Sequence, residues 1–546
     1  MTTPLISPST SLNPAQRIAV DHGDGPALVL AGAGSGKTRV LTARIARLIE
    51  DGHAKPHDIM AVTFTNKAAT EMRHRVARAL GSDPAGMWIG TFHGLGARFI
   101  RMHAEAAGRT REFSIYDEDD SLSLIKRLME RARVSTRDWT PRAVNASISD
   151  AKNALVAPDE YAALSQTPLG KAAAAVYQLL DPALREANAV SFDDLLVIPV
   201  QLLGRPEIRE QWHRRFRYVL VDEYQDTNRA QYEFIHRIAG PTGNVMAVGD
   251  DDQAIYGWRG ADVRNILDFE RGFPNARVVR LEDNYRSTPQ ILDLANAVIA
   301  ENRDRRGKTL RATHEGGAPV TLTTCLDERD EADVIADAIE RRPREIGLGS
   351  IAILYRTNAQ SRPLEDALRK RVIPYRLIGA VRFYDRREVK DLVSWLRVIA
   401  NPKDDEAFRR AVQAPKRGIG DTTLEVLAVE ARDAGCGLFE RCARGGLPAA
   451  IRPAARESLA QVVAVIERLR LLAAEASVDR LLGELIRAIG YAESLKAEGP
   501  EGEERLQNVQ ELITSAAETV VDDGGEVGMR PLDHFLQRAT LVSAAD

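Results

Sequence analysis

The sequence is poor in cysteine and has no long hydrophobic run. Its three cysteines, Cys325, Cys436 and Cys442, lack the spacing of metal ligands and leave at least one thiol unpaired. A run of about 18 apolar residues, which a membrane helix needs, occurs nowhere. The first residues have neither a basic nor an apolar segment of the kind that directs export. We therefore expect a protein of the reducing cytoplasm, without a membrane-spanning segment.

An excess of positive charge is also missing. Lysine and arginine number 74 against 78 aspartate and glutamate, which gives a net charge of −4. This balance excludes a protein that holds nucleic acid by bulk electrostatics alone, so any contact with nucleic acid must be local. The length of 546 residues exceeds what one hydrophobic core supports, and about three or four domains are expected.

Short β-rich runs, each followed by a helical pattern, predict an α/β fold. Alternating strands and helices are typical of parallel sheets covered on both faces. We expect two such sheets, and therefore two α/β domains. The predicted strands of the first lie at 26–32, 58–65, 218–223 and 244–250, and those of the second at 276–281, 320–325, 350–356 and 374–379.

Two stretches, roughly 105–190 and 380–546, break this alternation and have helical periodicity. The first separates strands of one sheet, which is typical of a domain inserted at an exposed loop. Each stretch is therefore predicted to be an all-helical insertion. The predicted division is 1–105 and 191–275 for the first α/β domain, 106–190 for its insertion, 276–379 for the second α/β domain and 380–546 for the second insertion.

The segment PALVLAGAGSGKTRV contains an apolar strand, a glycine-rich turn and the start of a helix, which is a P-loop. Backbone N–H groups of such a turn surround the β-phosphate, while Lys37 reaches the β/γ oxygens and the Thr38 hydroxyl coordinates Mg²⁺. The first consensus glycine is replaced by Ala31, a small residue that still permits the turn. The predicted phosphate-binding residues are Ala33, Gly34, Ser35, Gly36, Lys37 and Thr38.

The segment YVLVDEYQDTN is the second half of a nucleotide site. A buried strand that ends in Asp222 and Glu223 brings both carboxylates to the carboxyl edge of the sheet, beside the P-loop. Asp222 is expected to hold Mg²⁺, and Glu223 to orient and deprotonate the attacking water. Such a pair alone is more often a solvated loop. Together with the P-loop it predicts hydrolysis of ATP with Mg²⁺.

Further segments, in order, resemble the UvrD/PcrA/Rep family of superfamily-one DNA helicases over nearly the whole chain. The matching segments are LNPAQRIAV, AVTFTNKAATEM, GTFHG, SFDDLL, VDEYQDTN, VGDDDQAIYGWRGA, LEDNYRS and FYDRREVKD. The resemblance implies two RecA-like P-loop parallel-sheet motor domains, the second incomplete here, each with an all-helical inserted domain. It also implies ATP-driven 3′-to-5′ movement on single-stranded DNA and unwinding at junctions with duplex, in DNA repair or replication.

The same resemblance assigns further nucleotide contacts. Gln16 would read adenine, and Tyr285 would stack on it opposite Arg39. Gln253 would touch the γ-phosphate, and Arg286 would reach it from the second motor domain. ATP would then hold the two domains together, and hydrolysis would let them open.

The family's DNA contacts also map onto this sequence. Stacking on bases falls to Phe64, Phe192, Tyr256 and Trp258, and contact with the DNA backbone to Thr91, His93 and Arg259. Any one aromatic is more often a core residue, except Trp258, which lies in a polar Gly-Trp-Arg-Gly loop. Gly418, Gly420 and Thr423 resemble a turn that meets duplex phosphates, although an ordinary turn between helices is the alternative.

The family's last two motifs, including its arginine finger, have no match in this sequence. Loss of such a finger costs about 10³ to 10⁵ in rate, so we expect the chain as written to be a poor ATPase. We also expect local disorder between roughly 276 and 380. One alternative is a nucleotide-gated protein that binds single strands without unwinding. Another is a helicase-nuclease subunit, which would need a nuclease domain that is not in this sequence.

Overall fold

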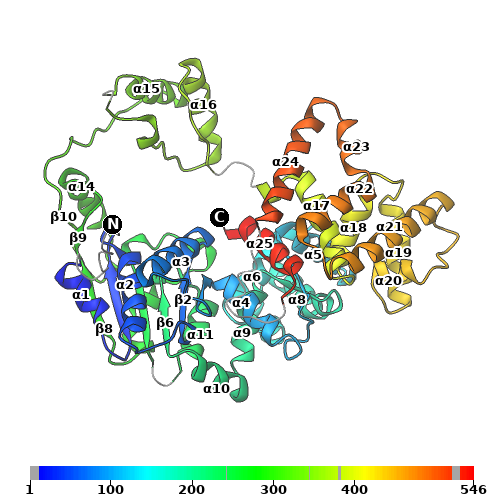
Figure 1. The fold of residues 1–546 in the computed structure, drawn as a ribbon, viewed down its shortest axis with the longest axis horizontal. Helices are drawn as coiled ribbons and strands as arrows, with labels where there is room; N and C mark the ends of the chain where they lie inside the picture. The colour runs from blue at the N-terminus through cyan, green and yellow to red at the C-terminus, as the bar shows by residue number, and fades with distance from the viewer. Residues whose placement is uncertain (1–11, 241–242, 343–344, 379–382, 519–528, 546) are drawn as a thin grey trace.

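The computed structural model describes residues 12–240, 243–342, 345–378, 383–518 and 529–545. A sheet with its covering helices forms one part of the molecule, and a larger set of helices forms another, at the right of Figure 1. A third, smaller part contains α15 (Glu328–Glu340) and α16 (Ser361–Lys370), which stand apart from the sheet. Among the described helices, none is long and apolar enough to cross a membrane.

The sheet has six parallel strands in the order β3-β2-β6-β7-β1-β8. It confirms the strands expected at 26–32, 58–65, 218–223 and 244–250. It also contains a short strand after Met87 that the sequence analysis did not predict. The strands are β1 (Ala27–Ala31), β2 (Ile59–Thr63), β3 (Trp88–Thr91), β6 (Tyr218–Val221), β7 (Val245–Gly249) and β8 (Arg277–Leu281).

Successive side chains of β1 pack alternately into the two hydrophobic cores, one on each face of the sheet. Val29 packs with the helices of one face, whereas Leu28 and Leu30 pack with those of the other, because successive side chains of a strand point to opposite sides. The first face is covered by α1 (Pro14–Val20), α2 (Lys37–Glu50) and α3 (Asn66–Leu80). The second is covered by α4 (Phe92–Met102), α9 (Asp194–Leu202), α10 (Pro206–Arg215), α11 (Arg229–Ile238), α12 (Arg264–Leu267) and α13 (Phe269–Gly272).

The placement of the strand at 276–281 in a second sheet is wrong. β8 lies at the edge of the first sheet and pairs in parallel with β1, Val279 opposite Val29. Its burial explains this position, since Val279 and Leu281 pack in the core that covers one face of that sheet. The chain then leaves through β9 (Asp283–Asn284), α14 (Pro289–Ile299) and β10 (Arg311–Ala312), which pairs with β9.

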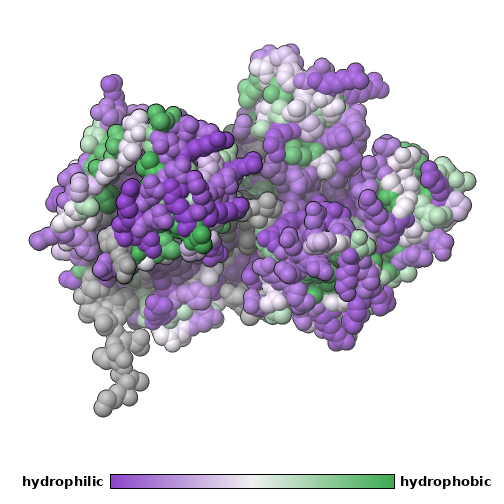
Figure 2. Space-filling view, turned by 90° about the horizontal axis from the view of Figure 1, so that it is seen from above, coloured by the Kyte–Doolittle hydropathy of each residue, from purple (hydrophilic) through white to green (hydrophobic). Residues whose placement is uncertain are grey.

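The expected second sheet is not formed in the part of the chain that the structure describes. Residues 320–325, 350–356 and 374–378 contain no strand, because none has a hydrogen-bonded neighbour. Several of their apolar side chains lie in solvent instead, Leu322 at 95% exposure and Leu354 at 92%, whereas Ile351 and Ile353 are half-buried. Hydrophobic residues reach the surface of the lobe at the left of Figure 2. α15 and α16 form a small core of their own around Ala336 and Leu368.

Where the structure describes them, the two stretches predicted to be helical consist of helices and their connections, apart from two short strands at the ends of the first. β4 (Ser114–Tyr116) pairs in parallel with β5 (Ala189–Ser191), and four helices with their own core lie between them: α5 (Glu118–Arg131), α6 (Pro141–Asn153), α7 (Pro158–Leu164) and α8 (Pro168–Glu186). Another core holds α17 (Arg387–Ala400), α18 (Asp405–Gln413), α19 (Asp421–Asp433), α20 (Leu438–Ala443), α21 (Pro453–Leu472), α22 (Val478–Ile489), α23 (Tyr491–Lys496), α24 (Pro500–Ala517) and part of α25 (Pro531–Ala545).

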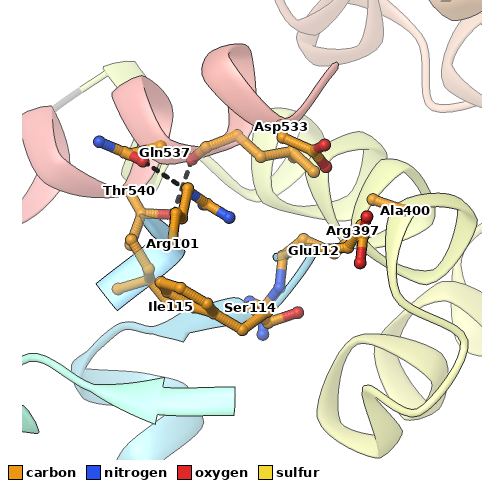
Figure 3. A pocket seen from close by; sticks show the side chains of 11 residues that line it. Arg101, Glu112, Ser114, Ile115, Arg397, Ala400, Asp533, Gln537 and Thr540 are labelled. Carbon is orange, nitrogen blue, oxygen red and sulfur yellow. Dashed lines mark hydrogen bonds between the residues drawn. The ribbon is translucent and has the colours of Figure 1, made fainter. Parts of the chain in front are cut away.

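The last helix, α25, returns to the sheet-containing part. The Asn66 side-chain amide donates to the Leu541 carbonyl at 3.2 Å. Arg101 on α4 donates to Gln537 at 3.0 Å, inside a small crevice between α4, α17 and α25 (Figure 3). This crevice is a junction between the helical and sheet parts, and it does not include the P-loop.

Candidate nucleotide and DNA site

The P-loop turn follows β1 directly and leads into α2. Gly34 and Gly36 have φ of +68° and +90°, a conformation that disfavours other residues. Ala31, by contrast, lies within β1, in register with Leu281, so a glycine is not required there. The N-terminus of α2 has no side-chain cap. Its first N–H groups therefore face the turn, the arrangement that anion sites use.

Lys37, Thr38, Asp222 and Glu223 come together beside this turn. The Lys37 ammonium group donates to Glu223 Oε2 at 2.8 Å. The Thr38 hydroxyl lies 3.4 Å from Asp222 Oδ2. Glu223 has a φ of +50°, an uncommon conformation for a residue with a side chain. The sequence-predicted pairing of the two segments is thus found in the fold.

Burial changes the acidity of this group. Burial, and then the neighbouring Glu223 carboxylate, raises the pKa of Asp222 to about 6. The same two causes raise the pKa of Asp226 to about 7. A site with acidic groups of raised pKa next to a lysine is typical of a place that receives further positive charge, such as a metal ion.

Gln16 is buried and lies against the P-loop. Its amide nitrogen donates to the Ser35 carbonyl at 2.9 Å, and its oxygen accepts from the Asn13 N–H at 3.1 Å. Both ends of the amide therefore already bond to the chain, and a two-pronged contact with adenine would need them to change partners. Asn13 also donates to the Tyr285 hydroxyl at 2.9 Å. Asn13 thus joins Gln16 and Tyr285 at one corner of the site, and their contacts with adenine remain predictions.

The segment after β8 packs on the P-loop from the other side. The Asn284 amide donates to the Ala33 carbonyl at 2.5 Å, and the Tyr285 N–H donates to the Gly34 carbonyl at 2.9 Å. A side chain at Gly34 would lie 2.6 Å from Arg286 Cβ. Arg286 is exposed beside the turn, and Arg39 lies one residue after Thr38 in α2. Their contacts with nucleotide remain predictions.

Gln253 belongs to a short 3-10 turn, Asp251–Gln253, that follows β7. Its amide donates to Asp250 Oδ2 at 2.7 Å. Gln225 connects this turn to Glu223, because its amide donates to Glu223 Oε2 at 3.0 Å while its oxygen accepts from the Asp250 N–H at 2.9 Å. A hydrogen-bonded path therefore runs from Glu223 to Gln253.

The predicted stacking residues form two groups. Phe64 and Tyr256 are stacked with ring centroids 5.3 Å apart, and Trp258 lies 6.3 Å from Tyr256. Trp258 is 71% exposed, so it is not a core residue. The Arg259 guanidinium lies 4.8 Å from its ring centroid. These four side chains come from loops after β2 and β7 and form one aromatic and basic surface.

The second group is less accessible. Phe192 packs partly against the core and lies 4.7 Å from the His93 ring. Burial lowers the pKa of His93 to about 4, so its imidazole is neutral near pH 7. The Thr91 hydroxyl accepts from the Gly94 N–H and caps α4, with the residue 3% exposed. Thr91 therefore has a structural role here, and its contact with DNA remains a prediction.

The turn at 418–420 lies at the start of α19, far from the P-loop in the chain. Gly418 has a φ of +74°, and no atom lies within 4 Å of a side chain placed at Gly418 or Gly420. Both glycines are exposed while Ile419 between them is buried, and Thr423 is half-buried. The turn is thus anchored by Ile419 with an open backbone, and its contact with duplex DNA remains a prediction.

Several connecting residues escaped the sequence analysis. Gln225 could have been found, since it is a polar residue two positions after Glu223 within a predicted site segment. Asn13 and Asn284 carried a weaker signal, as polar neighbours of Gln16 and Tyr285. Lys308, which contacts the loop after β7, had no signal, because nothing in the sequence relates positions so far apart.

A parallel sheet whose first strand leads through a glycine turn to Lys37, with Asp222 and Glu223 beside it, defines the class of P-loop nucleotide-binding proteins. Residues 12–274 match the UvrD/REP helicase N-terminal domain, and residues 279–443 match the UvrD-like helicase C-terminal domain. The chain belongs to the UvrD/PcrA/Rep family of superfamily-one, ATP-dependent DNA helicases.

Similar proteins agree along nearly the whole chain. DNA helicase II of Escherichia coli (strain K12) is 42% identical over 97% of this chain and 74% of its own length. ATP-dependent DNA helicase PcrA of Bacillus subtilis (strain 168) is 41% identical over 92% of this chain and 69% of its own. ATP-dependent DNA helicase UvrD1 of Mycobacterium bovis is 41% identical over 98% and 73%.

Proposed function

We propose that the site described above binds Mg²⁺ and ATP and couples hydrolysis to 3′-to-5′ movement on single-stranded DNA. The observation that carries the proposal is the hydrogen-bonded path from Glu223 through Gln225 and Asp250 to Gln253. Gln253 lies on the loop that continues to Tyr256 and Trp258. One loop can therefore respond to the phosphates and alter the grip on a base.

The ion pair between Lys37 and Glu223 supplies the first step of the proposed mechanism. Phosphate oxygens entering the P-loop would compete with Glu223 for the Lys37 ammonium group, since phosphate binds cations strongly. Release of Glu223 from this pair would leave its carboxylate able to accept a proton from water. Glu223 is 35% exposed in its side chain, so water reaches it.

Mg²⁺ would be held by the Thr38 hydroxyl and the Asp222 carboxylate. Both are oxygen ligands, which Mg²⁺ prefers, and they lie 3.4 Å apart. A divalent cation would favour the ionised form of Asp222, whose pKa is raised by burial. The ion would supply charge stabilisation for the phosphates.

We propose that the stretch after β8, residues 283–378, acts as the second motor domain and that Arg286 and Tyr285 bring it to the nucleotide. Support comes from the contacts of Asn284 and Tyr285 with the P-loop backbone. The 546 residues contain no match to the family's arginine finger. We therefore propose that residues 1–546 by themselves turn over ATP slowly, because part of the negative charge of the transition state is left without a compensating cation.

The test is steady-state ATP hydrolysis by residues 1–546 with and without oligo(dT), in Mg²⁺ and in EDTA. We expect hydrolysis that requires Mg²⁺ and rises with oligo(dT). A hydrolysis rate that is the same in Mg²⁺ and in EDTA, and the same with and without oligo(dT), would contradict the proposal. Strand displacement on 3′-tailed against 5′-tailed duplexes tests the direction, and preference for the 5′ tail would overturn it.

A further inference from the structure

Lys308 is a buried lysine held by three consecutive carboxylates. Its ammonium nitrogen lies 2.7 Å from Asp250, 2.6 Å from Asp251 and 2.8 Å from Asp252, and its side chain is 2% exposed. An ammonium group has three N–H donors, and here each has a carboxylate partner. Lys308 comes from the segment between α14 and β10, whereas the three aspartates follow β7 at the edge of the nucleotide site.

The three aspartates by themselves have the spacing of a cation site, with ligand atoms within 4.8 Å of one another. In this structure the cation that pairs with all three carboxylates is the ammonium group of Lys308. Burial lowers the pKa of Lys308, but the Asp250 carboxylate and its neighbours more than offset this, and the pKa lies above its usual value. Burial raises the pKa of Asp251, but the hydrogen bonds from Lys308 and the Arg306 N–H, together with the charge of Lys308, lower it below its usual value. Lys308 and Asp251 are therefore both charged near pH 7.

Neighbouring residues strengthen the same attachment. Arg305 holds Asp252 with two hydrogen bonds of 2.9 and 2.7 Å, and the Arg306 N–H donates to Asp251 at 2.7 Å. On the far side of this segment, Leu310 lies against the P-loop, 2.2 Å from where a side chain on Gly32 would stand. The segment 305–310 therefore spans from the aspartates to the phosphate turn.

Asp250 is the member of the cluster that connects to the chemistry. Its Oδ1 contacts Lys308 while its Oδ2 accepts from Gln253, and its N–H donates to Gln225, which bonds to Glu223. Because the buried Lys308 holds one oxygen of the Asp250 carboxylate, the other oxygen of this rigid group is held in position as well. The position of Gln253 thus depends on Lys308, through Asp250.

We infer that Lys308 is a positioning residue for coupling: through Asp250 it sets the position of Gln253 and of the loop that carries the exposed Trp258. The inference rests on the proposed function for the meaning of this loop, but not for the attachment itself. Lys308 does not touch nucleotide or DNA. Its effect is to make the loop respond as one rigid piece when the γ-phosphate site changes.

The test compares Lys308→Met, Lys308→Arg and the wild type in residues 1–546. The measured quantity is the ratio of ATP turnover with saturating oligo(dT) to turnover without it. Single residues in a coupling network change coupling by about twofold to thirtyfold, and we expect a loss of that size in Lys308→Met. Lys308→Arg keeps the charge but has a planar donor group that cannot meet three carboxylates in the same way, so it should restore the ratio only in part.

Hydrogen exchange of the peptide covering 250–259 supplies a readout that needs no activity. We expect faster exchange there in Lys308→Met, with β1 unchanged. The matched control is Arg311→Met. Arg311 directly follows the segment 305–310 and forms an exposed ion pair with Glu282, at 3.1 Å, that does not involve the three aspartates. It should alter neither readout.

Unchanged exchange at 250–259, or an unchanged stimulation ratio in Lys308→Met, would overturn the inference. If Lys308→Met does not fold, Lys308→Arg decides, and a wild-type ratio in that variant would overturn it. A wild-type chain that oligo(dT) does not stimulate would refute the proposed function instead, while the exchange experiment would still decide whether Lys308 fixes the loop.

Discussion

Lys37 and Glu223 share a hydrogen bond of 2.8 Å although 186 positions separate them in the chain. One follows β1 and the other follows β6, so the parallel sheet brings their two ends to the same edge. In the structure the Lys37 ammonium group and the Glu223 carboxylate neutralise each other. Substitution of the two residues should therefore have opposite effects on nucleotide binding, although either substitution should stop turnover.

Lys37→Ala should abolish ATP turnover, because it removes the one cation that the P-loop itself places at the β/γ-phosphates. The fold should remain intact, since the Lys37 side chain lies at the edge of the sheet and not in its core. Equilibrium binding of a fluorescent ATP analogue and steady-state turnover measure the effect. Wild-type affinity together with wild-type turnover would refute the P-loop assignment.

Glu223→Gln should keep Mg·ATP bound and block hydrolysis. The amide preserves the shape of the side chain but cannot take a proton from water. It also removes the negative partner of Lys37, which should tighten nucleotide binding. A single-turnover assay with radiolabelled ATP separates binding from cleavage, and normal cleavage in this variant would assign the base to another residue.

Trp258→Ala should weaken the binding of single-stranded DNA by about 1–3 kcal/mol, or about 5- to 150-fold in Kd, with little dependence on base sequence. The reason is that stacking on an exposed indole does not read base edges. Fluorescence anisotropy of labelled oligo(dT) and a mixed sequence measures it. Trp258→Phe is the matched control, because it keeps a ring and should retain most of the affinity; equal losses in both variants would argue against stacking.

The buried pair of Lys152 and Asp194, 2.7 Å apart, should make stability depend on pH. Burial raises the pKa of Asp194. The charge of Lys152 and its hydrogen bond lower this pKa by more, so it lies below the ordinary value of 3.8. The stabilisation is thus present above pH 3.8 and is lost as pH falls through the lower pKa of the folded state. Asp194→Asn leaves Lys152 unpaired and should cost about 3–5 kcal/mol near neutrality.

Thermal unfolding of the wild type and Asp194→Asn measures this difference across a range from about pH 2.5, well below the ordinary pKa of an aspartate, to about pH 7. The advantage of the wild type should be constant at the upper end and shrink at the lower end. Asp150→Asn, which changes an exposed carboxylate on the same helix as Lys152, should show no such dependence. A constant advantage at every pH would contradict the assignment.

The sequence predicted the strands of the first sheet and the proximity of the P-loop to Asp222 and Glu223, because local signals were strong there. The buried runs before Gly32 and Asp222 identify strands, and their polar ends identify the site edge. It placed β8 in the wrong sheet, since a run such as ARVVRL carries no information about its neighbour. It predicted strands around Leu322 and Leu354 because short β-rich runs indicate β structure, whereas a strand also needs a hydrogen-bonded partner, which the run alone does not supply.

The position of β8 limits how far the parts of the nucleotide site can separate. Leu281 is fixed in the first sheet, and only five residues later the chain reaches Arg286. Five residues span at most about 17 Å when fully extended. The short connection to Leu281 therefore keeps Arg286 close to the P-loop. α15 and α16 lie farther along the chain and are not held by this connection. Any opening of the molecule should be small at the nucleotide and grow with distance from β8.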